Sequence, residues 1–202
     1  LNTRKKLYFF PILFIIIVYY LYHKDSLSNL YIVPIGSALV KKLLVIWHSR
    51  TQTAYQAAQA ALQGAMQVQD ELGQSYSIDL VHVEQVNLSQ LLDADAYIFC
   101  APENLGSLSG AMKEFFDRFY YDLLDKIQGR YYSAIISAGS DGQGALRQLQ
   151  RICTGWRLHE KVTPIIINTQ SQTPEEIMAP KTLTAEQRQA AHELGATLSA
   201  WL

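Results

Sequence analysis

The sequence predicts an α/β protein built on a doubly wound, five-stranded parallel sheet. Five apolar stretches of strand length recur after residue 41, and stretches with helical periodicity separate most of them. Continuous apolar runs are typical of strands buried on both faces, and right-handed crossovers then place helices on both sides of the sheet. With 202 residues, of which 49% are hydrophobic and 17% charged, the chain can bury one sizeable core.

The first predicted strand covers residues 42–47 (KLLVIW), a continuous apolar run that a polar loop and an alanine-rich stretch follow. Apolar residues in this stretch recur at steps of four and three, which predicts a helix with one buried face. That face consists of Ala54, Ala58, Ala61, Ala65, Val68 and Leu72. Gly73 is the expected end of the helix.

Four further apolar runs predict the remaining strands, over residues 77–83, 96–100, 131–138 and 163–168. A helix is expected after Gly110, with a buried face made of Met112, Phe115, Phe116, Phe119, Leu123 and Ile127. The last helix begins with Thr184 and Gln187 in a capping-box arrangement. Its end is expected to supply core contacts from Leu198, Trp201 and Leu202.

An apolar segment precedes this domain. Residues 7–22 carry no charge and follow Arg4, Lys5 and Lys6. This pattern is typical of a membrane helix, although a length of about 24 Å is short for a hydrocarbon core of about 30 Å. Two interpretations stay open: a genuine anchor through residues 7–22, or an upstream segment outside the functional product, since the first methionine is Met66. We therefore separate residues 1–37 from a domain over residues 38–202.

Charge and cysteine content exclude several classes of function. Seventeen basic and eighteen acidic residues give a formal net charge of −1, which is too balanced for a nucleic-acid binder that neutralises many phosphates. Cys100 and Cys153 lie in apolar or amphipathic stretches without CxxC spacing. Neither a disulfide framework nor a zinc site is expected. Reduced thiols fit a cytoplasmic protein, with membrane anchoring through residues 7–22 as the alternative.

The loop after the first strand suits a phosphate group. It reads His48-Ser49-Arg50-Thr51-Gln52-Thr53-Ala54 and leads directly into the first helix. Three hydroxyls, one guanidinium and the free N–H groups of the helix start gather within this turn, and such donors stabilise a phosphate dianion. Ser and Thr are also favoured as ordinary N-caps, so a second observation is needed.

That observation is a similar loop on a neighbouring strand, covering residues 101–110 (APENLGSLSG). In doubly wound sheets, ligands bind beyond the carboxyl ends of the strands at the point where the strand order reverses. Two such loops therefore define a cleft. The glycines of the second loop allow the backbone to approach a flat ligand closely.

Residues 94–117 (ADAYIFCAPENLGSLSGAMKEFFD), together with the loop HSRTQTA, resemble the flavodoxin and NADPH-dependent FMN reductase superfamily. The resemblance covers about residues 41–202 and implies a flavodoxin-like strand order of 2-1-3-4-5 with non-covalently bound FMN. It implies that the FMN phosphate is held by Ser49, Arg50, Thr51, Gln52 and Thr53. It implies that the flavin ring is bordered by Pro102, Glu103, Asn104, Leu105 and Gly106. A third contact is expected from residues 138–142, which include Gly139 and Asp141.

The sequence departs from the family pattern at two places. Gln52 stands where the phosphate loop usually has glycine. If this position requires a positive φ, glutamine costs about 1 kcal/mol or more relative to glycine. Leu105 and Leu108 occupy the second loop, where flavodoxins that carry electrons place aromatic residues. We therefore expect a ring that is more open to a second substrate.

The resemblance implies an oxidoreductase in which FMN accepts a hydride from NAD(P)H, the co-substrate, and reduces a small quinone-like or flavin acceptor. The cofactor performs this chemistry, so no catalytic acid, base, nucleophile or metal is expected from the protein. Two alternatives stay open: an electron carrier that does not bind nicotinamide, and a degenerate domain that has lost FMN. Family analogy also suggests a homo-oligomer.

Other polar residues have both a functional and an ordinary interpretation. His48 could hydrogen-bond the flavin or a nicotinamide, or serve as a satisfied loop histidine. Arg147, Arg151 and Arg157 follow the third loop and could attract a nicotinamide phosphate, or form a solvated helix face. The sequence alone does not separate these interpretations.

Overall fold

A computed structural model describes residues 40–73 and 75–202. The expectations for residues 1–37, including the membrane anchor through residues 7–22, lie outside the described residues. Within the part of the chain that is described, no helix is both long enough and apolar enough to cross a membrane.

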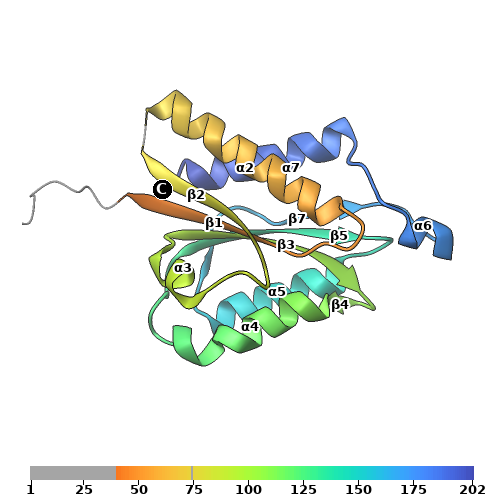
Figure 1. Cartoon of the computed structure of the whole chain (residues 1–202), viewed down its shortest axis with the longest axis horizontal. Coiled ribbons are helices and arrows are strands. Elements are labelled where there is room, and N and C mark those ends of the chain that lie inside the picture. Colours follow the sequence, from red (N-terminus) through yellow and green to blue (C-terminus); the bar gives the residue numbers. More distant parts are fainter. Residues whose placement is uncertain (1–39, 74) are drawn as a thin grey trace, which may run out of the picture. The chain divides into compact units, whose positions relative to one another are not determined.

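Five parallel strands make up the main sheet (Figure 1). In chain order they are β1 (Lys41–Trp47), β2 (Tyr76–His82), β3 (Ala96–Asn104), β5 (Tyr131–Ala138) and β7 (Ile165–Asn168). Their order across the sheet is β2-β1-β3-β5-β7, and each neighbouring pair is parallel. The predicted order 2-1-3-4-5 is confirmed.

Two short strands add to this sheet. β4 (Ser107–Leu108) turns back and pairs antiparallel with the end of β3. β6 (His159–Glu160) pairs with the start of β5, and β7 pairs with the later residues of β5. Pro164 lies between β6 and β7 and has no N–H to donate to a ladder. The edge is therefore interrupted, and β7 begins two residues later than the predicted strand over residues 163–168.

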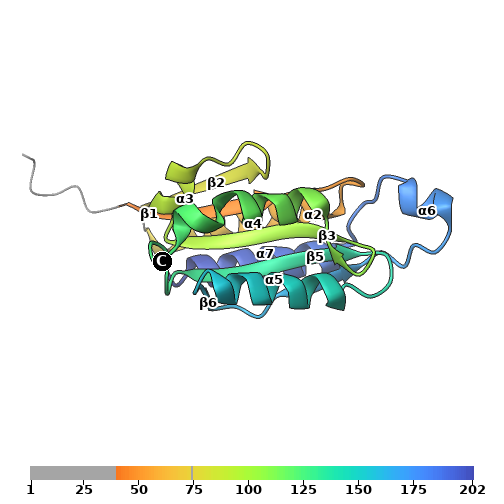
Figure 2. The same cartoon turned by 90° about the horizontal axis from the view of Figure 1, so that it is seen from below.

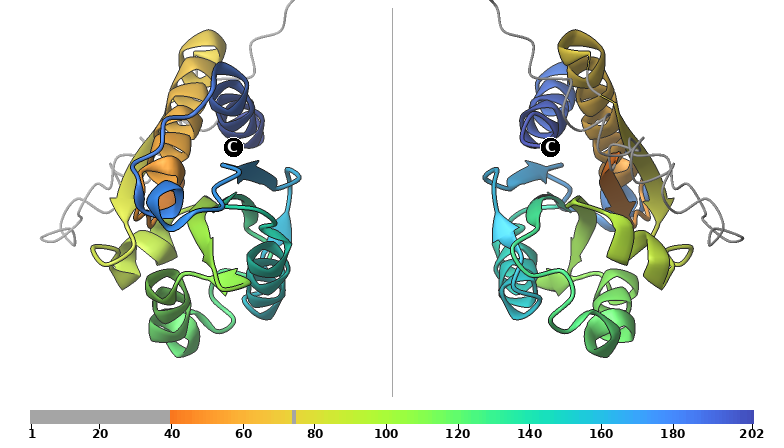
Figure 3. Two further views of the ribbon diagram at one scale, coloured as in Figure 1. Left: turned by 90° about the vertical axis from the view of Figure 1, so that its right-hand side faces the viewer. Right: turned by 90° about the vertical axis from the view of Figure 1, so that its left-hand side faces the viewer.

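Helices cover both faces of the sheet, as predicted (Figure 3). One face carries α3 (Leu88–Asp93), α4 (Gly110–Leu123) and α5 (Gln143–Gly155). The other face carries α2 (Thr53–Leu72) and α7 (Ala185–Ser199). The short helix α6 (Pro174–Met178) projects beyond the end of the sheet (Figure 2).

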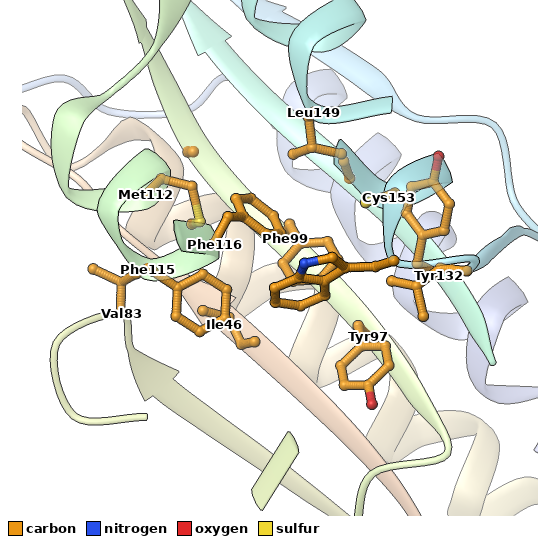
Figure 4. Close-up of a cluster of buried hydrophobic side chains, with 14 of the residues drawn as sticks. Ile46, Val83, Tyr97, Phe99, Met112, Phe115, Phe116, Tyr132, Leu149 and Cys153 are labelled. Carbon is orange, nitrogen blue, oxygen red and sulfur yellow. The ribbon is translucent and has the colours of Figure 1, made fainter. Parts of the chain in front are cut away.

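The two faces of the sheet have different cores. On β3, Tyr97 and Phe99 point to the α4 and α5 face, whereas Ile98 and Cys100 point to the α2 and α7 face, as the two-residue period of a strand requires. The first core is aromatic: Phe99 packs against Phe116 with ring centroids 5.1 Å apart (Figure 4). Each such fully buried ring contributes about 2 to 3 kcal/mol to stability.

The second core depends on small residues that bring α2 and α7 close together. Ala57, Ala61 and Ala65 of α2 are fully buried. A Cβ atom added to Gly64 would lie 2.0 Å from the His192 carbonyl oxygen, and one added to Gly195 would lie 1.9 Å from that of Ala61. The backbones of the two helices therefore pack in direct contact.

Three expectations for individual residues were wrong. Leu72 and Trp201 were expected in the core, but they are 54% and 56% exposed. Leu72 lies in the last turn of α2, next to the left-handed Gly73 that ends the helix. Trp201 lies beyond α7, where Lys161 Nζ approaches its ring centroid to 3.4 Å. Ile127 is buried, but it belongs to the turn after α4, which ends at Leu123.

Candidate functional site

The three predicted loops meet at one edge of the sheet, beyond the carboxyl ends of β1, β3 and β5. This edge is the right-hand end in Figure 1 and faces the viewer in the left panel of Figure 3. Hydrogen bonds connect the loops in series. His48 Nδ1 lies 2.8 Å from Ser109 Oγ, and Glu103 Oε2 accepts from the Gly142 N–H at 2.7 Å. The edge is therefore a connected scaffold for a ligand.

The first loop offers a set of unused hydrogen-bond donors. The backbone N–H groups of residues 49–53 donate to no acceptor within the part of the chain that is described. The first bond of α2 starts only at Gln56, whose N–H donates to the Gln52 carbonyl at 2.9 Å. Five N–H groups at the positive end of a 20-residue helix suit an anion.

Side chains extend this set of donors. Thr53 is 2% exposed, and its Oγ1 has no hydrogen-bond partner among the residues described. A buried hydroxyl without a partner costs about 1 to 3 kcal/mol. The side chains of Ser49, Arg50 and Thr51 also form no hydrogen bond with another described residue. A phosphate bound in this turn would satisfy the Thr53 hydroxyl and the free N–H groups together.

Gln52 adopts the left-handed conformation that the family's glycine accommodates. Its φ is 75° and its ψ is −16°, and its side chain makes no capping bond to α2. The side chain is exposed and does not fill the turn. Glutamine in place of the family's glycine therefore adds backbone strain, but its side chain does not block the turn.

Replacing Gln52 by glycine is expected to stabilise the protein by about 0.5 to 1 kcal/mol, because the relief of left-handed strain exceeds the added entropy of the unfolded chain. Gln170→Gly is the matched control, since Gln170 has a φ of 53° but lies outside the phosphate loop. Chemical unfolding of both variants measures the gain. A loss of stability in Gln52→Gly alone would show that the glutamine side chain contributes contacts that outweigh its strain.

The second loop is a tight hairpin rather than an open loop. β3 continues to Asn104, and β4 pairs Ser107 with Asn104 and Leu108 with Glu103. The two turn residues, Leu105 and Gly106, have φ values of 52° and 74°, the pattern of a type I′ turn. Leu105 is fully exposed at the tip, whereas Leu108 is buried.

Glu103 braces this hairpin against the third loop. Its carboxylate accepts from the N–H groups of Gly142, at 2.7 Å, and Ala145, at 3.2 Å, and so caps the start of α5. The hairpin also packs closely on α5, since a Cβ atom added to Gly144 would lie 2.1 Å from the Gly106 carbonyl oxygen. The hairpin, which the resemblance places at the border of the ring, is thus held rigidly on α5, and its glutamate is hydrogen-bonded to the start of that helix.

The third loop lies between β5 and α5. Asp141 is exposed, and Gly139 is half-buried. The Gly139 carbonyl accepts from the Ser171 N–H at 3.0 Å. This bond ties the loop to the segment after β7. The structure therefore places all twelve residues implied by the resemblance at one edge of the sheet, with the Glu103 carboxylate already hydrogen-bonded within the protein.

Two contacts at this edge had no signal in the sequence. The Lys181 N–H donates to the Thr51 carbonyl at 2.8 Å, and Gln56 Nε2 donates to the Lys181 carbonyl at 2.6 Å. The two bonds fasten the first loop and the start of α2 to a segment more than 120 residues away in the chain. Only the folded structure brings these groups together, because Gln56 and Lys181 lie in no recognisable motif.

His48 is a half-buried histidine between the first and second loops. Burial lowers its pKa below the usual 6.5, and the positive charges of His82 and Arg50 lower it further, while Glu84 opposes them. The imidazole is therefore held neutral, hydrogen-bonded to the fully buried Ser109 that precedes α4. This role as a bridge between the loops favours positioning over contact with the ligand.

The lowered pKa of His48 predicts a loss of stability at acid pH. As the pH falls, the unfolded chain takes up a proton on His48 near pH 6.5, before the folded protein does. The stability that the neutral imidazole contributes is therefore complete above pH 6.5 and is lost as the pH falls toward the lowered pKa of the folded protein. Chemical unfolding from about pH 7.5 to about pH 5 should show a smaller loss for His48→Gln, which does not titrate. Parallel curves for the two proteins would contradict this assignment.

Comparison with known proteins agrees with this geometry. The protein family described as NADPH-dependent FMN reductase matches residues 48–169. A flavodoxin from Aquifex aeolicus (strain VF5) is 27% identical over 165 residues, which cover 80% of this chain and 86% of that protein.

Solved structures support the fold. An archaeal flavodoxin has a TM-score of 0.61 at 17% identity and covers 79% of this chain and 97% of its own. An oxidoreductase from Corynebacterium diphtheriae has a TM-score of 0.62 at 19% identity and covers 81% and 97%.

The fold is that of the flavodoxin-like, FMN-binding flavoproteins. The chain belongs to the NADPH-dependent FMN reductase family. The residues present fit this cofactor. The buried Thr53 hydroxyl and the N–H groups of residues 49–53, which have no partner among the described residues, suit its phosphate, and the braced hairpin at Leu105 and Gly106 would border its ring.

Proposed function

We propose that the protein is an NAD(P)H-dependent oxidoreductase that uses FMN to reduce a small quinone-like or flavin acceptor. The observation that carries this proposal is the phosphate turn at residues 49–53, in which five N–H groups and the buried Thr53 hydroxyl have no partner in the described part of the chain. Family membership supports the oxidoreductase class.

The protein's own residues bind and position. FMN, when bound, supplies the chemistry of accepting a hydride from a nicotinamide and passing electrons to a second substrate. Ser49, Arg50 and Thr53 would hold its phosphate by charge-assisted hydrogen bonds. The hairpin turn at Leu105 and Gly106 would border the ring, and the hydrogen bonds that Glu103 accepts from the Gly142 and Ala145 N–H groups fix the position of the hairpin.

The shape of the hairpin favours an enzyme over an electron carrier. Leu105, at its tip, is fully exposed, and Leu108 is buried in the core, so neither position places an aromatic side chain on the ring. A ring without an aromatic cover would leave room for nicotinamide and acceptor in turn. The near-neutral net charge of −1 also argues against a carrier, since carriers generally steer weak encounters with a surface of one sign.

An anaerobic titration of the purified protein with NADPH tests the proposal. Yellow protein that loses its flavin absorbance on addition of NADPH, and regains it with a quinone, is the expected result. Flavin that binds but is not reduced would contradict the proposal and support the alternative of an electron carrier. Protein that is colourless and does not take up added FMN would contradict the proposal and support the alternative of a degenerate domain that has lost FMN.

Other aspects of this proposal concern location and assembly. We propose a cytoplasmic protein, with anchoring through residues 7–22 as the alternative, and a homo-oligomer by family analogy. The free cysteines Cys100 and Cys153 support the cytoplasmic location. Both are buried, and burial raises the pKa of each thiol. Such thiols stay unreactive.

A further inference from the structure

A groove of about 580 Å³ lies between the β3–β4 hairpin and α5. It is lined by Gly106, Ser107, Arg147, Gln148, Arg151 and Ile152. This volume falls within the range of about 300 to 1,000 Å³ that is typical of small-molecule sites. Figure 1 shows β4 beside α5 at the loop-bearing end of the sheet. None of the three loops assigned to FMN contains the arginines of this groove.

The two arginines are exposed on one face of α5 and are separated by one helical turn. Residues at i and i+4 have Cβ atoms about 5 to 6 Å apart, and like charges at this spacing destabilise a helix. Arg147 and Arg151 form no ion pair or hydrogen bond with any described residue. Arg157, by contrast, pairs with Asp125 beyond the other end of α5.

The groove has the donors that a phosphate monoester requires. Two guanidinium groups can each bind a phosphate through paired N–H donors. Gln148 adds to them, because its Oε1 accepts from the Leu108 N–H at 2.7 Å and its amide N–H groups have no partner in the described part of the chain. Ile152 and the arginine stems offer apolar surface on which a purine can lie.

Position connects the groove to the proposed flavin site. Gly106 belongs both to the hairpin turn that borders the ring and to the wall of the groove. A dinucleotide whose nicotinamide lies against the ring would therefore extend its adenosine half toward Arg147 and Arg151. The groove itself is fixed, since Glu103 and Gln148 hold the hairpin on α5.

We propose that Arg147 and Arg151 in this groove bind the adenosine 2′-phosphate of NADPH and are the residues by which this chain distinguishes NADPH, the reductant in the family's description, from NADH. This inference rests on the proposed reductase function and adds the site that selects the reductant. Because a phosphate dianion is the recognised group, inorganic phosphate and 5′-AMP are the competing sources of the same chemistry.

Calorimetry on the full-length holoprotein with 2′,5′-ADP, 5′-AMP and inorganic phosphate tests the site without any turnover. We expect 2′,5′-ADP to bind at least about tenfold more tightly than either other probe, and R147Q/R151Q to lose at least about tenfold of that affinity. R147K/R151K keeps the charge and should retain most of it. R188Q, which removes an exposed arginine from α7 on the opposite face, should bind as the unchanged protein does.

Steady-state kinetics supplies the second readout. R147Q/R151Q should raise KM for NADPH by about tenfold or more and leave KM for NADH and kcat nearly unchanged. If R147Q/R151Q and the unchanged protein bind 2′,5′-ADP with equal affinity, the groove is not the site of the 2′-phosphate. The proposal is also overturned if 2′,5′-ADP binds no more tightly than 5′-AMP.

The two proposals fail separately. Arginine-dependent binding of 2′,5′-ADP without flavin reduction by NADPH would keep the site and remove the reductase function. Flavin reduction by NADPH with the same KM in R147Q/R151Q would keep the function and remove the site. Both arginines are exposed and unpaired among described residues, so the double variant should fold, and its melting temperature checks this.

Discussion

Thr53→Val is expected to weaken FMN binding by about 10- to 100-fold while making the protein without FMN more stable. Valine has the shape of threonine, so the packing at the start of α2 is kept. The hydroxyl that it removes is buried and has no partner among the residues described. In the FMN-free protein this hydroxyl costs about 1 to 3 kcal/mol, and when a phosphate accepts from it the bond contributes a similar amount.

The opposite signs of the two effects make this prediction specific. Fluorescence titration with FMN measures the affinity, and chemical unfolding of the FMN-free protein measures the stability. Thr154→Val is the matched control, since its hydroxyl is exposed on α5 and donates to the Gln150 carbonyl. Unchanged FMN affinity in Thr53→Val would show that this hydroxyl does not contact the phosphate.

Gly195→Ala is expected to destabilise the protein by about 3 kcal/mol, and so to lower its melting temperature by on the order of 10 °C. The added Cβ atom would lie 1.9 Å from the Ala61 carbonyl oxygen and 2.6 Å from its carbonyl carbon. These are backbone atoms of α2, so no side chain can rotate away. The two helices must separate, and α2 carries the phosphate turn at its start.

Gly155→Ala provides the control for this substitution. Gly155 is the last residue of α5, and an added Cβ atom would meet nothing within 4 Å. Alanine there should be neutral or stabilise by up to about 1 kcal/mol, because it lowers the entropy of the unfolded chain. Similar melting temperatures for Gly195→Ala and Gly155→Ala would contradict the close packing of α2 and α7.

Hydrophobic pattern was sufficient for most of the fold. β5 covers the eight residues predicted for it, and Gly73 caps the end of α2 as expected. Errors arose where a local feature outweighed the pattern. Pro164 interrupts the edge strand, and the hairpin turn at Leu105 and Gly106 converts a predicted loop into strand. A helical period can also continue past the true end of a helix: Ile127 fits the predicted buried face, but α4 ends at Leu123.

The site was predictable only in its local parts. The composition of residues 49–53 indicated a phosphate turn, because hydroxyls and a helix start adjoin in the sequence. The bonds that hold the loops in place were not predictable, since Gln56 at the start of α2 meets Lys181, and Glu103 of the hairpin meets Gly142, across long stretches of chain. Likewise, the groove at Arg147 and Arg151 exists only because the hairpin folds back onto α5.

The most direct test of the account compares the binding of FMN and riboflavin, which share the ring and differ by the phosphate. If residues 49–53 hold the phosphate, FMN should bind at least about 100-fold more tightly than riboflavin, because several charge-assisted hydrogen bonds are lost with that group. Equal affinities would contradict the account, since the free N–H groups and the Thr53 hydroxyl would then have no part in binding the cofactor.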